Sequence, residues 1–423
     1  MKTIIEARDT MEAVCAALEK ILAHRKSRPT VPSETLYYQL VLDYFQKILN
    51  AREEGKFIVG HTVMAPTEIF YAMDLVPMSL ENVSSMMAIL LNKYGEFLGS
   101  ASAFGLAPET CSAHRMLAGA VLREAVTSPD CIVWSSQVCD NTSKSGDALL
   151  DLYGIPGFFL DRPYKYTAEA VRYYTRQMEE LVEFLEDQSG KKLNQDKLAE
   201  AVDLSNQVIN IYREIYELRK AIPAPMRNRN LVNQSTIEGI YSGTQQGVHF
   251  LEMVRDEIRQ NVVAGKGVVP EERYRLLFLF LPPFYEMKIL DWLEKEQGAV
   301  SVMEPFISYF SPGQMDPQRP LESVAAKTFY RCLAKPMHGP ADPFIDDALK
   351  IAHEFKADGA VYFAHIGCRQ ACALIRTLKD RLKEELDMPT LVIDVDIMDP
   401  SLSSGEELRD KFERFFEILD EKK

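Results

Sequence analysis

Short apolar runs alternate with amphipathic stretches in two parts of the chain, residues 56–165 and 271–423. The runs have the length of buried strands, and the stretches between them carry apolar residues at helical spacing. In chain order the runs are KFIVG, LVPMSL, CIVWSS and PGFFLD, then RLLFLFLPP, AVSVMEP, GAVYFAHIG and PTLVIDVD. Strands that alternate with helices are typical of parallel βαβ units, so the pattern predicts an α/β protein with two similar open parallel sheets, flavodoxin-like or Rossmann-like.

The remaining parts of the chain have little strand signal. Residues 166–270 contain long amphipathic stretches such as AEAVRYYTRQMEELVEFLEDQSG, and residues 1–55 also have helical spacing. A chain of 423 residues exceeds the size of one ordinary core. We therefore expect an N-terminal helical segment (1–55), a first α/β domain (56–165), a helical linker or insert (166–270) and a second α/β domain (271–423).

Composition and charge narrow the class of partner. The chain is 47% hydrophobic and 26% charged, as in globular proteins, and its formal net charge is −14. An acidic chain without a basic arm is not expected to bind a nucleic-acid backbone. No apolar run approaches the roughly 20 residues that span a bilayer, and the first residues lack a signal-peptide core. We expect a cytoplasmic protein with no nucleic-acid partner and no membrane contact.

Two cysteines occupy equivalent places in the two predicted sheets. Cys139 follows the strand CIVWSS and Cys368 follows the strand GAVYFAHIG, each just past the carboxyl end of its strand. At this edge of an open parallel sheet ligands bind. An internal duplication that places two sheets across a cleft explains the match, and so does the general likeness of βαβ units. Both interpretations stay open at this point.

The cysteine pattern excludes several kinds of site. Seven cysteines without a secretion signal do not indicate a disulfide framework, and the absence of a CxxC pair excludes a local zinc knuckle or ferredoxin-type site. Cys111, like Cys139 and Cys368, precedes a predicted helix, whose N-terminus favours a thiolate. Three such cysteines suit an iron–sulfur cluster with one iron open to substrate, whereas free cysteines more often pack as inert thiols. Cys372 is expected to pack beneath the loop.

Six segments carry a resemblance to a known family. They are MAPTEIFYAMDLVPMSLEN, CSAHRMLAGAVL, IVWSSQVCDNTSK, IPGFFLDRPY, ADGAVYFAHIGCRQ and MPTLVIDVDIMDP. In this order they resemble the 2-hydroxyacyl-CoA dehydratase family (component D type), which also includes the ring-reducing subunits of benzoyl-CoA reductase. The order of three separated cysteines is the most specific element of the likeness.

The resemblance implies an oxygen-sensitive subunit of an anaerobic hydro-lyase. It implies that Cys111, Cys139 and Cys368 bind a [4Fe-4S] cluster whose open iron takes the thioester carbonyl of an acyl-CoA. It also implies a heterodimer with a related second subunit, and a separate ATP-dependent iron–sulfur activator that supplies one electron. The implied reaction removes water from an (R)-2-hydroxyacyl-CoA through ketyl radicals and gives a 2-enoyl-CoA. The sequence has no GxxxxGK[ST] motif, which agrees with ATP being handled by another protein.

The resemblance also indicates acid–base residues. Glu81 aligns with a carboxylate suited to proton transfer near the cluster. Where some dehydratase subunits carry a run of serines, this chain has His61, Thr62 and Val63. Either His61 or Thr62 is expected to replace a hydroxyl donor, or the substrate lacks a 2-hydroxyl. The alternatives are a benzoyl-CoA reductase-like subunit, a double-cubane-cluster reductase subunit, and a non-catalytic partner that relays electrons.

Overall fold

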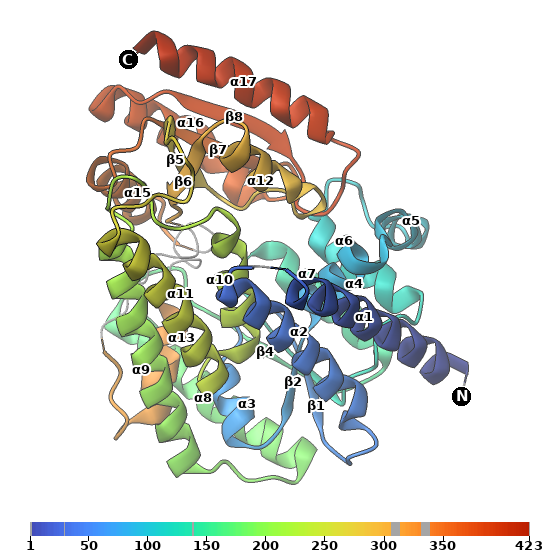
Figure 1. Cartoon of the computed structure of the whole chain (residues 1–423). Helices are drawn as coiled ribbons and strands as arrows, with labels where there is room; N and C mark the ends of the chain where they lie inside the picture. Colours follow the sequence, from blue (N-terminus) through green and yellow to red (C-terminus); the bar gives the residue numbers. More distant parts are fainter. Residues whose placement is uncertain (1, 29, 138, 306–313, 331–338, 423) are drawn as a thin grey trace.

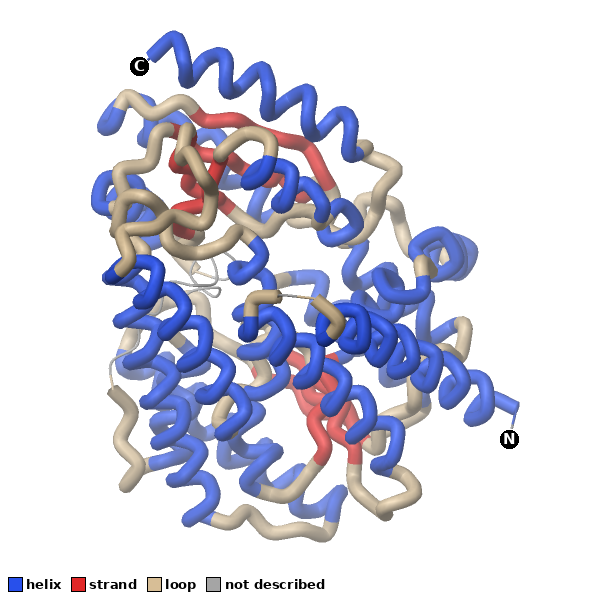
Figure 2. The backbone as a smooth tube through the Cα atoms, viewed as in Figure 1, coloured by secondary structure: helices blue, strands red, loops and turns tan. Residues whose placement is uncertain are grey.

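Two four-stranded parallel sheets, surrounded by helices, form the frame of the molecule (Figures 1 and 2). The computed structural model describes the chain except residues 1, 29, 138, 306–313, 331–338 and 423. The first sheet has the order β2-β1-β3-β4 and the second the order β6-β5-β7-β8. The strands are β1 (Ile58–His61), β2 (Val76–Ser79), β3 (Cys131–Ser135), β4 (Gly157–Leu160), β5 (Tyr274–Leu279), β6 (Ala299–Met303), β7 (Gly359–His365) and β8 (Thr390–Val395).

The two sheets have the same connectivity. In each, the first strand pairs with the second on one side and with the third on the other, and the fourth strand forms the far edge. The first three strands of each sheet are buried throughout, whereas the fourth strand is partly exposed. Strands covered on both faces have continuous apolar sequences, which is the pattern seen above. The prediction of two open parallel sheets is confirmed, and the matching order supports an internal duplication.

Helices cover both faces of the sheets and make up the segment between them. They are α1 (Lys2–Lys26), α2 (Pro32–Ala51), α3 (Thr67–Ala72), α4 (Leu80–Leu91), α5 (Tyr94–Phe104), α6 (Ser112–Leu122), α7 (Asp140–Tyr153), α8 (Ala168–Ser189), α9 (Gln195–Leu218), α10 (Arg229–Tyr241), α11 (Gln245–Val263), α12 (Lys288–Lys295), α13 (Pro320–Phe329), α15 (Asp342–Glu354), α16 (Arg369–Leu386) and α17 (Gly405–Lys422), with a short 3-10 helix η1 (Phe284–Glu286). In Figure 1, α17 lies along the second sheet at the top of the molecule. None of the described helices is long and apolar enough to cross a membrane.

The helical segment between the sheets has clear boundary signals. The side chains of Thr167, Asn194 and Thr244 accept hydrogen bonds from backbone amides in the first turns of α8, α9 and α11. Such N-caps satisfy donors that the helix itself leaves unpaired. Gly190 ends α8 in the left-handed region, with φ of 70°. The predicted helical character of this part of the chain is confirmed, while the four predicted domain limits stay a prediction.

One helix from the C-terminal half packs on the first half. Phe329 and other apolar residues of α13 belong to the core on one face of the first sheet, together with α8 and α9. Lys327 of α13 forms a buried ion pair with Glu68 of α3, and the Ser205 hydroxyl donates to Glu68 over 2.8 Å. Burial acts to raise the pKa of Glu68, but the Lys327 ammonium outweighs it, so the pKa lies below its usual value. The two halves are therefore joined by packing as well as by the chain.

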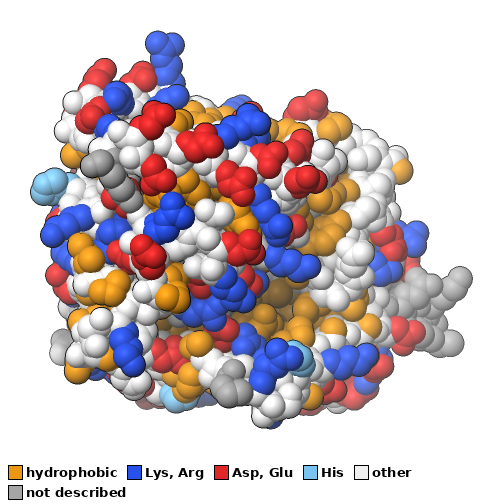
Figure 3. All heavy atoms as spheres, turned by 45° about the horizontal axis from the view of Figure 1, so that its top comes forward, with side chains coloured by type: hydrophobic (Ala, Val, Ile, Leu, Met, Phe, Trp, Pro, Cys, Tyr) orange, Lys and Arg blue, Asp and Glu red, His pale blue; other side chains and the backbone are white. Residues whose placement is uncertain are grey.

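The surface carries charges of both signs. On the face drawn in Figure 3, Lys and Arg side chains gather beside a hollow near its centre, while Asp and Glu side chains are spread over the rest of the face. The Lys and Arg side chains beside the hollow contrast with the acidic net charge of the whole chain.

Candidate active site between the two sheets

The three cysteines of the predicted cluster site have the same backbone setting. Cys111 directly precedes α6, Cys139 precedes α7, and Cys368 precedes α16. Cys139 and Cys368 follow equivalent strands, β3 and β7, at their carboxyl ends. The unpaired amides of a helix N-terminus stabilise negative charge, so all three sulfur atoms sit where a thiolate is favoured by the backbone.

All three cysteines line one cavity where the two halves meet. The cavity has a volume of about 190 Å³, and its wall is mostly apolar. Helix α10 contributes a third side, between the halves. The apolar wall is formed by Val63, Met64, Ala113, Phe280, Leu281, Phe284 and Ile397. The polar side chains are Glu81, Asn82, Ser85, His114, Asn141, Thr142, Ser235, Thr236 and His365.

The loops that carry the cysteines touch each other across the interface. A Cβ atom added to Gly367 would lie 2.6 Å from the Cα atom of Cys111, so only glycine allows this approach. The Asn141 amide donates to the Gly367 carbonyl over 3.2 Å, and Arg369 forms an ion pair with Asp140. The loops of the first and second sheets are therefore held in contact at the cavity.

Without a bound cation, the three thiols would be neutral at pH 7. Burial, and then the charge of Asp396 and of the other two cysteines, raises the pKa of Cys111 well above its usual value. Burial also raises the pKa of Cys139 and of Cys368, the latter to about 12. The Thr142 hydroxyl lies 3.1 Å from the Cys139 sulfur and counteracts part of the shift there. Buried thiols that repel each other as thiolates are suited to a cationic metal centre, which compensates that repulsion.

The donor set fits a cluster better than a single ion. Among the described residues, no group of three or more His, Cys, Asp or Glu side chains lies close enough to bind one metal ion. In a cubane cluster each thiolate binds a different iron, so the sulfur ligands lie farther apart than the ligands of a single metal ion. Three cysteines around one cavity with apolar walls fit such an arrangement. Cys372 is not on the wall, and its thiol donates to the His365 carbonyl over 3.3 Å.

Glu81, near the start of α4, supplies a carboxylate to the same cavity. Its side chain is 6% exposed, and neither carboxylate oxygen has hydrogen-bond geometry with a described group. Burial raises the pKa of Glu81 to about 7, although the His114 charge and nearby amides of Glu81 and Val63 oppose the rise. A buried carboxylate with such a pKa is suited to gain and lose a proton near neutral pH.

His114 lies beside this carboxylate and was not singled out in the sequence. Its Nε2 atom is 3.7 Å from the Cys139 sulfur, and its Nδ1 atom is 2.8 Å from the Ser145 hydroxyl. Burial lowers its pKa, and Glu81 opposes that shift. The available signal was its place three residues after Cys111, in the first turn of an apolar helix that begins at a predicted ligand position.

His61 and Thr62 are fully buried but are not among the side chains that line the cavity. His61 donates from Nδ1 to the Thr62 carbonyl over 2.9 Å, and its ring packs against Phe70. Burial lowers its pKa to about 4. The residues that reach the wall are the next two, Val63 and Met64. The role expected for His61 and Thr62 stays a prediction.

His365, at the end of β7, is on the wall of the cavity. Its Nε2 atom donates to the Leu281 carbonyl over 2.7 Å, so the proton is on Nε2 and the Nδ1 atom carries a lone pair. The Nδ1 atom has no partner among the described residues. His365 therefore joins the ends of β5 and β7 and leaves one acceptor at the cavity.

A family model named 2-hydroxyglutaryl-CoA dehydratase, D-component, matches residues 62–419. This chain belongs to that family. The match covers the second sheet and the first sheet except β1, and it includes Cys111, Cys139 and Cys368. The resemblance seen in the sequence is confirmed.

Individual proteins similar to this chain have low sequence identity with it but match most of its length. The chain is 22% identical to a benzoyl-CoA reductase subunit of Thauera aromatica, over 94% of this chain and 98% of that one. It is 22% identical to the (R)-phenyllactyl-CoA dehydratase alpha subunit of Clostridium sporogenes, over 89% and 92%. It is 21% identical to the (R)-2-hydroxyisocaproyl-CoA dehydratase alpha subunit of Clostridioides difficile, over 91% and 95%. The relatives include both dehydratase and reductase subunits.

Proposed function

We propose that this chain is the iron–sulfur subunit of an ATP-activated (R)-2-hydroxyacyl-CoA dehydratase, which forms a 2-enoyl-CoA through ketyl radical intermediates. The observation that carries the proposal is the cavity in which three cysteines from both halves meet the unpartnered carboxylate of Glu81. The family match and two relatives named as dehydratase alpha subunits support the same reaction class.

The reaction needs two contributions. Cys111, Cys139 and Cys368 would hold a [4Fe-4S] cluster, which supplies an open iron as Lewis acid for the thioester carbonyl and accepts and returns one electron. Loss of the 2-hydroxyl and of one β-proton makes one molecule of water, and the electron is recovered, so the net reaction is redox-neutral. A thioester does not acidify the β-position in the closed-shell substrate. The β-proton becomes acidic enough for a carboxylate only after one-electron reduction and loss of the 2-hydroxyl, and its removal then requires a base.

The side chains of this chain provide the base and the dry site. Glu81 takes the β-proton, since it is the buried carboxylate on the wall and burial raises its pKa to about 7. Phe280, Phe284 and Ile397 form part of the apolar wall that keeps water from the reacting carbons. His114 lies beside the Cys139 sulfur and near Glu81, whose charge opposes the lowering of the pKa of His114.

The proposal includes partners. A related second subunit is expected, since the dehydratase relatives are named alpha subunits. An ATP-dependent iron–sulfur activator is expected to supply the electron, in the cytoplasm and without oxygen. The substrate is an acyl-CoA thioester.

A second function, reduction of an aromatic acyl-CoA, is favoured by two observations. The benzoyl-CoA reductase relative from Thauera aromatica matches this chain over nearly the full length of both proteins. Val63 also stands on the cavity wall, at a position where a hydroxyl group would help to bind a 2-hydroxyl. A reductase needs electrons in stoichiometric amounts, whereas the dehydratase recycles one electron.

The test is anaerobic purification, an iron and sulfide count, and spectra with and without acyl-CoA thioesters. About four irons per chain and a spectrum changed by a thioester are expected, whereas about eight would favour a double-cubane protein. Turnover with activator and limiting reductant separates the two reactions. Many enoyl-CoA products per electron support dehydration, and product equal to the electrons supplied supports reduction. Iron without any response to thioesters would contradict both and favour the electron-relay subunit.

A further inference from the structure

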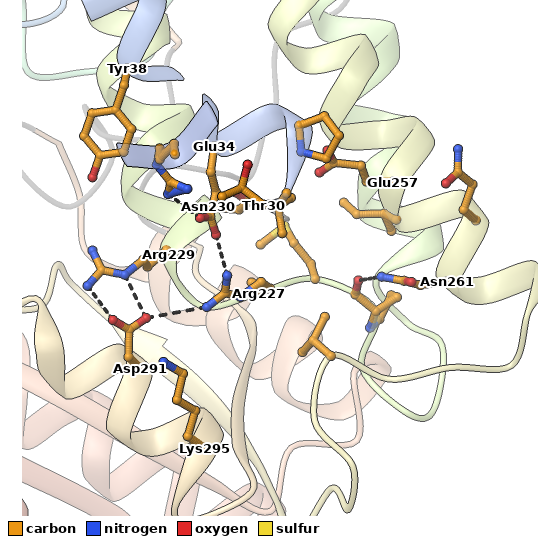
Figure 4. Close-up of a pocket in the computed structure, with 18 of the residues that line it drawn as sticks. Thr30, Glu34, Tyr38, Arg227, Arg229, Asn230, Glu257, Asn261, Asp291 and Lys295 are labelled. Carbon is orange, nitrogen blue, oxygen red and sulfur yellow. Dashed lines mark hydrogen bonds and ion pairs between the residues drawn. The ribbon is translucent and has the colours of Figure 1, made fainter. Parts of the chain in front are cut away.

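A second, larger cleft opens on the outside of the molecule, where three segments meet (Figure 4). It has a volume of about 1080 Å³ and lies between the α1–α2 junction, the start of α10, the end of α11, and the middle and end of α12. We call it the basic cleft. Its cationic side chains are Arg25, Arg28, Arg227, Arg229 and Lys295, with His24 beside them.

The basic cleft is positive on a chain that is strongly negative. Among the described residues, five Arg and Lys side chains line it against three carboxylates, while the chain has a net charge of −14. One of the carboxylates, Glu257, accepts hydrogen bonds from the backbone amide and hydroxyl of Ser33, at 2.8 Å and 2.6 Å. Its charge is thus directed at the first turn of α2 and not at the cleft.

Three arginines of the basic cleft are held in place by the other two carboxylates (Figure 4). Arg25 forms an ion pair with Glu34 over 2.6 Å. Arg227 forms ion pairs with Glu34 over 2.7 Å and with Asp291 over 3.5 Å. Arg229 makes a two-point contact with Asp291, at 2.8 Å and 2.6 Å. A guanidinium has five N–H donors, so these contacts fix the arginines and leave donors for an anion. Lys295 is exposed at the rim.

Asn230 gives an independent sign of a ligand. It lines the basic cleft and is only 4% exposed, yet its side-chain oxygen has no partner among the described groups. A buried amide without a partner is costly unless a ligand or water completes it. The wall of the cleft therefore has a polar atom that no described protein group satisfies.

Helix α10 connects the basic cleft with the cavity that holds the cysteines. Arg229 and Asn230 line the basic cleft at its start, and Ser235, Thr236 and Gly239 line the cysteine cavity farther along. At the helical rise of 1.5 Å per residue, the two sites are separated by roughly 8–15 Å along α10. One helix thus forms part of both walls.

A second row of residues runs beside α10 from one site to the other. Phe284 lines the cysteine cavity, whereas Asp291 and Lys295 line the basic cleft. Met287 lies between them, and its carbonyl accepts a hydrogen bond from Arg229 over 3.4 Å. These four residues follow one another at intervals of three or four, on one side of η1 and α12. Helix α10 and the η1–α12 segment therefore each reach from the cysteine cavity to the basic cleft.

We propose that the basic cleft binds the phosphates at the nucleotide end of the acyl-CoA, and that the pantetheine arm follows α10 to the cysteine cavity. This inference rests on the proposed function, because it takes the substrate class from there. Coenzyme A suits the arrangement: its nucleotide carries a diphosphate and a 3′-phosphate, and a flexible arm longer than this separation leads to the thioester. Arginine recognises phosphate with paired donors, and the cleft attracts the anionic substrate to a chain that otherwise repels it.

The test measures equilibrium binding to the full, anaerobically purified chain. The probes are an acyl-CoA, the matching dephospho-CoA thioester, the matching pantetheine thioester, and adenosine 3′,5′-bisphosphate. The variants are Lys295→Glu and Arg28→Gln in the basic cleft, with Lys379→Glu as control. Lys379 is exposed on α16, away from both sites. Variants at the exposed positions 28 and 295 are not expected to impair folding, which the iron content and circular dichroism of each protein verify.

The expected result has three parts. Lys295→Glu weakens acyl-CoA binding about tenfold or more, as loss of one charge-assisted hydrogen bond does, and Lys379→Glu leaves it unchanged. The pantetheine thioester binds the unsubstituted chain more weakly than the acyl-CoA and loses less affinity in Lys295→Glu. Adenosine 3′,5′-bisphosphate competes with the acyl-CoA, and raising the salt concentration weakens both.

Other outcomes overturn the inference and are separable from failure of the proposed function. Acyl-CoA binding that both cleft variants leave intact would overturn it while the dehydratase proposal stands. A nucleotide that binds the basic cleft without displacing acyl-CoA would also overturn it and would indicate a separate nucleotide site. A chain that binds no acyl-CoA thioester at all, with its cluster present, would contradict the proposed function itself.

Discussion

The two sheets of this protein share one strand order but contribute unequally to the cavity between them. Each places a cysteine at the carboxyl end of its third strand, before a helix. The first half adds Cys111 together with Glu81, whose carboxylate has no described partner. The second half adds His365, whose Nε2 atom donates a hydrogen bond to the Leu281 carbonyl. The shared strand order thus places cysteines at the cavity from two sides, whereas the buried carboxylate without a described partner comes from one half.

The largest expected effect concerns Cys139 and Cys368, the two cysteines that occupy equivalent positions in the two sheets. Cys139→Ala and Cys368→Ala should each abolish stable iron binding and turnover, because each half supplies a ligand that the other cannot replace. Iron and sulfide counts after anaerobic reconstitution measure this. Cys131→Ala is the matched control, since Cys131 is buried in β3 and does not line the cavity. Undiminished iron in Cys139→Ala would show that the cavity is not the cluster site.

The next prediction concerns Glu81, which the first half contributes to the cavity. Glu81→Gln should keep the iron but lower kcat by about 10²–10⁴, the range for a general base. The substitution keeps the shape and removes the proton acceptor. Turnover at saturating acyl-CoA, with iron content as control, measures it. An unchanged kcat would remove Glu81 from the mechanism and leave the chain without an assigned base.

A buried charge on the outer side of the first sheet should affect stability and not chemistry. Lys327→Met leaves Glu68 buried without its ion-pair partner, and such a change costs about 3–5 kcal/mol of the free energy of unfolding. Denaturant titration measures the loss. The double variant Glu68→Gln with Lys327→Met should recover part of it, because no uncompensated charge remains. Equal stability of the single variant and the parent protein would contradict the ion pair.

The sequence predicted the frame more fully than the site. Apolar runs of strand length located the strands of both sheets, because a parallel strand buried on both faces needs a continuous apolar sequence. The likeness of the segments around Cys139 and Cys368 anticipated the shared strand order. Contacts between segments that are distant in the sequence could not be predicted from it. Lys327 and Glu68 lie 259 residues apart, and local periodicity does not specify such a pair.

The site shows the same limit. The cysteines were found because thiols before helices form a local pattern, but the burial that raises the pKa of Glu81 comes from several elements at once. His114 was missed for this reason, as its chemistry depends on Ser145 and Cys139 and not on its own neighbours in sequence. The basic cleft joins three separate helical segments, so no single stretch of sequence indicates it.

The raised pKa of Glu81 predicts a pH effect on stability in the metal-free chain. The folded state holds this proton up to about pH 7, whereas an unfolded carboxyl loses it near its ordinary pKa of 4.5. The contribution of Glu81 to stability is therefore present at low pH and is lost as the pH rises through 7, by about 3 kcal/mol in total. Glu81→Gln should remove this pH dependence, measured as the difference in unfolding free energy between the two proteins at pH 5 and pH 8. A difference that does not change with pH would contradict the raised pKa.

The smallest effect concerns Cys372, the extra thiol of the second half. Its sulfur donates to the His365 carbonyl and does not line the cavity, so Cys372→Ala should keep the full iron content. The loss of one weak hydrogen bond costs about 1 kcal/mol or less, which a small decrease in Tm would report. The result sharpens the comparison because the helix after Cys139 has Ser143 at the matching position. If Cys372→Ala lost iron, the second half would contribute two thiolates, as the first half does with Cys111 and Cys139, and the predicted set of three cysteine ligands would be wrong.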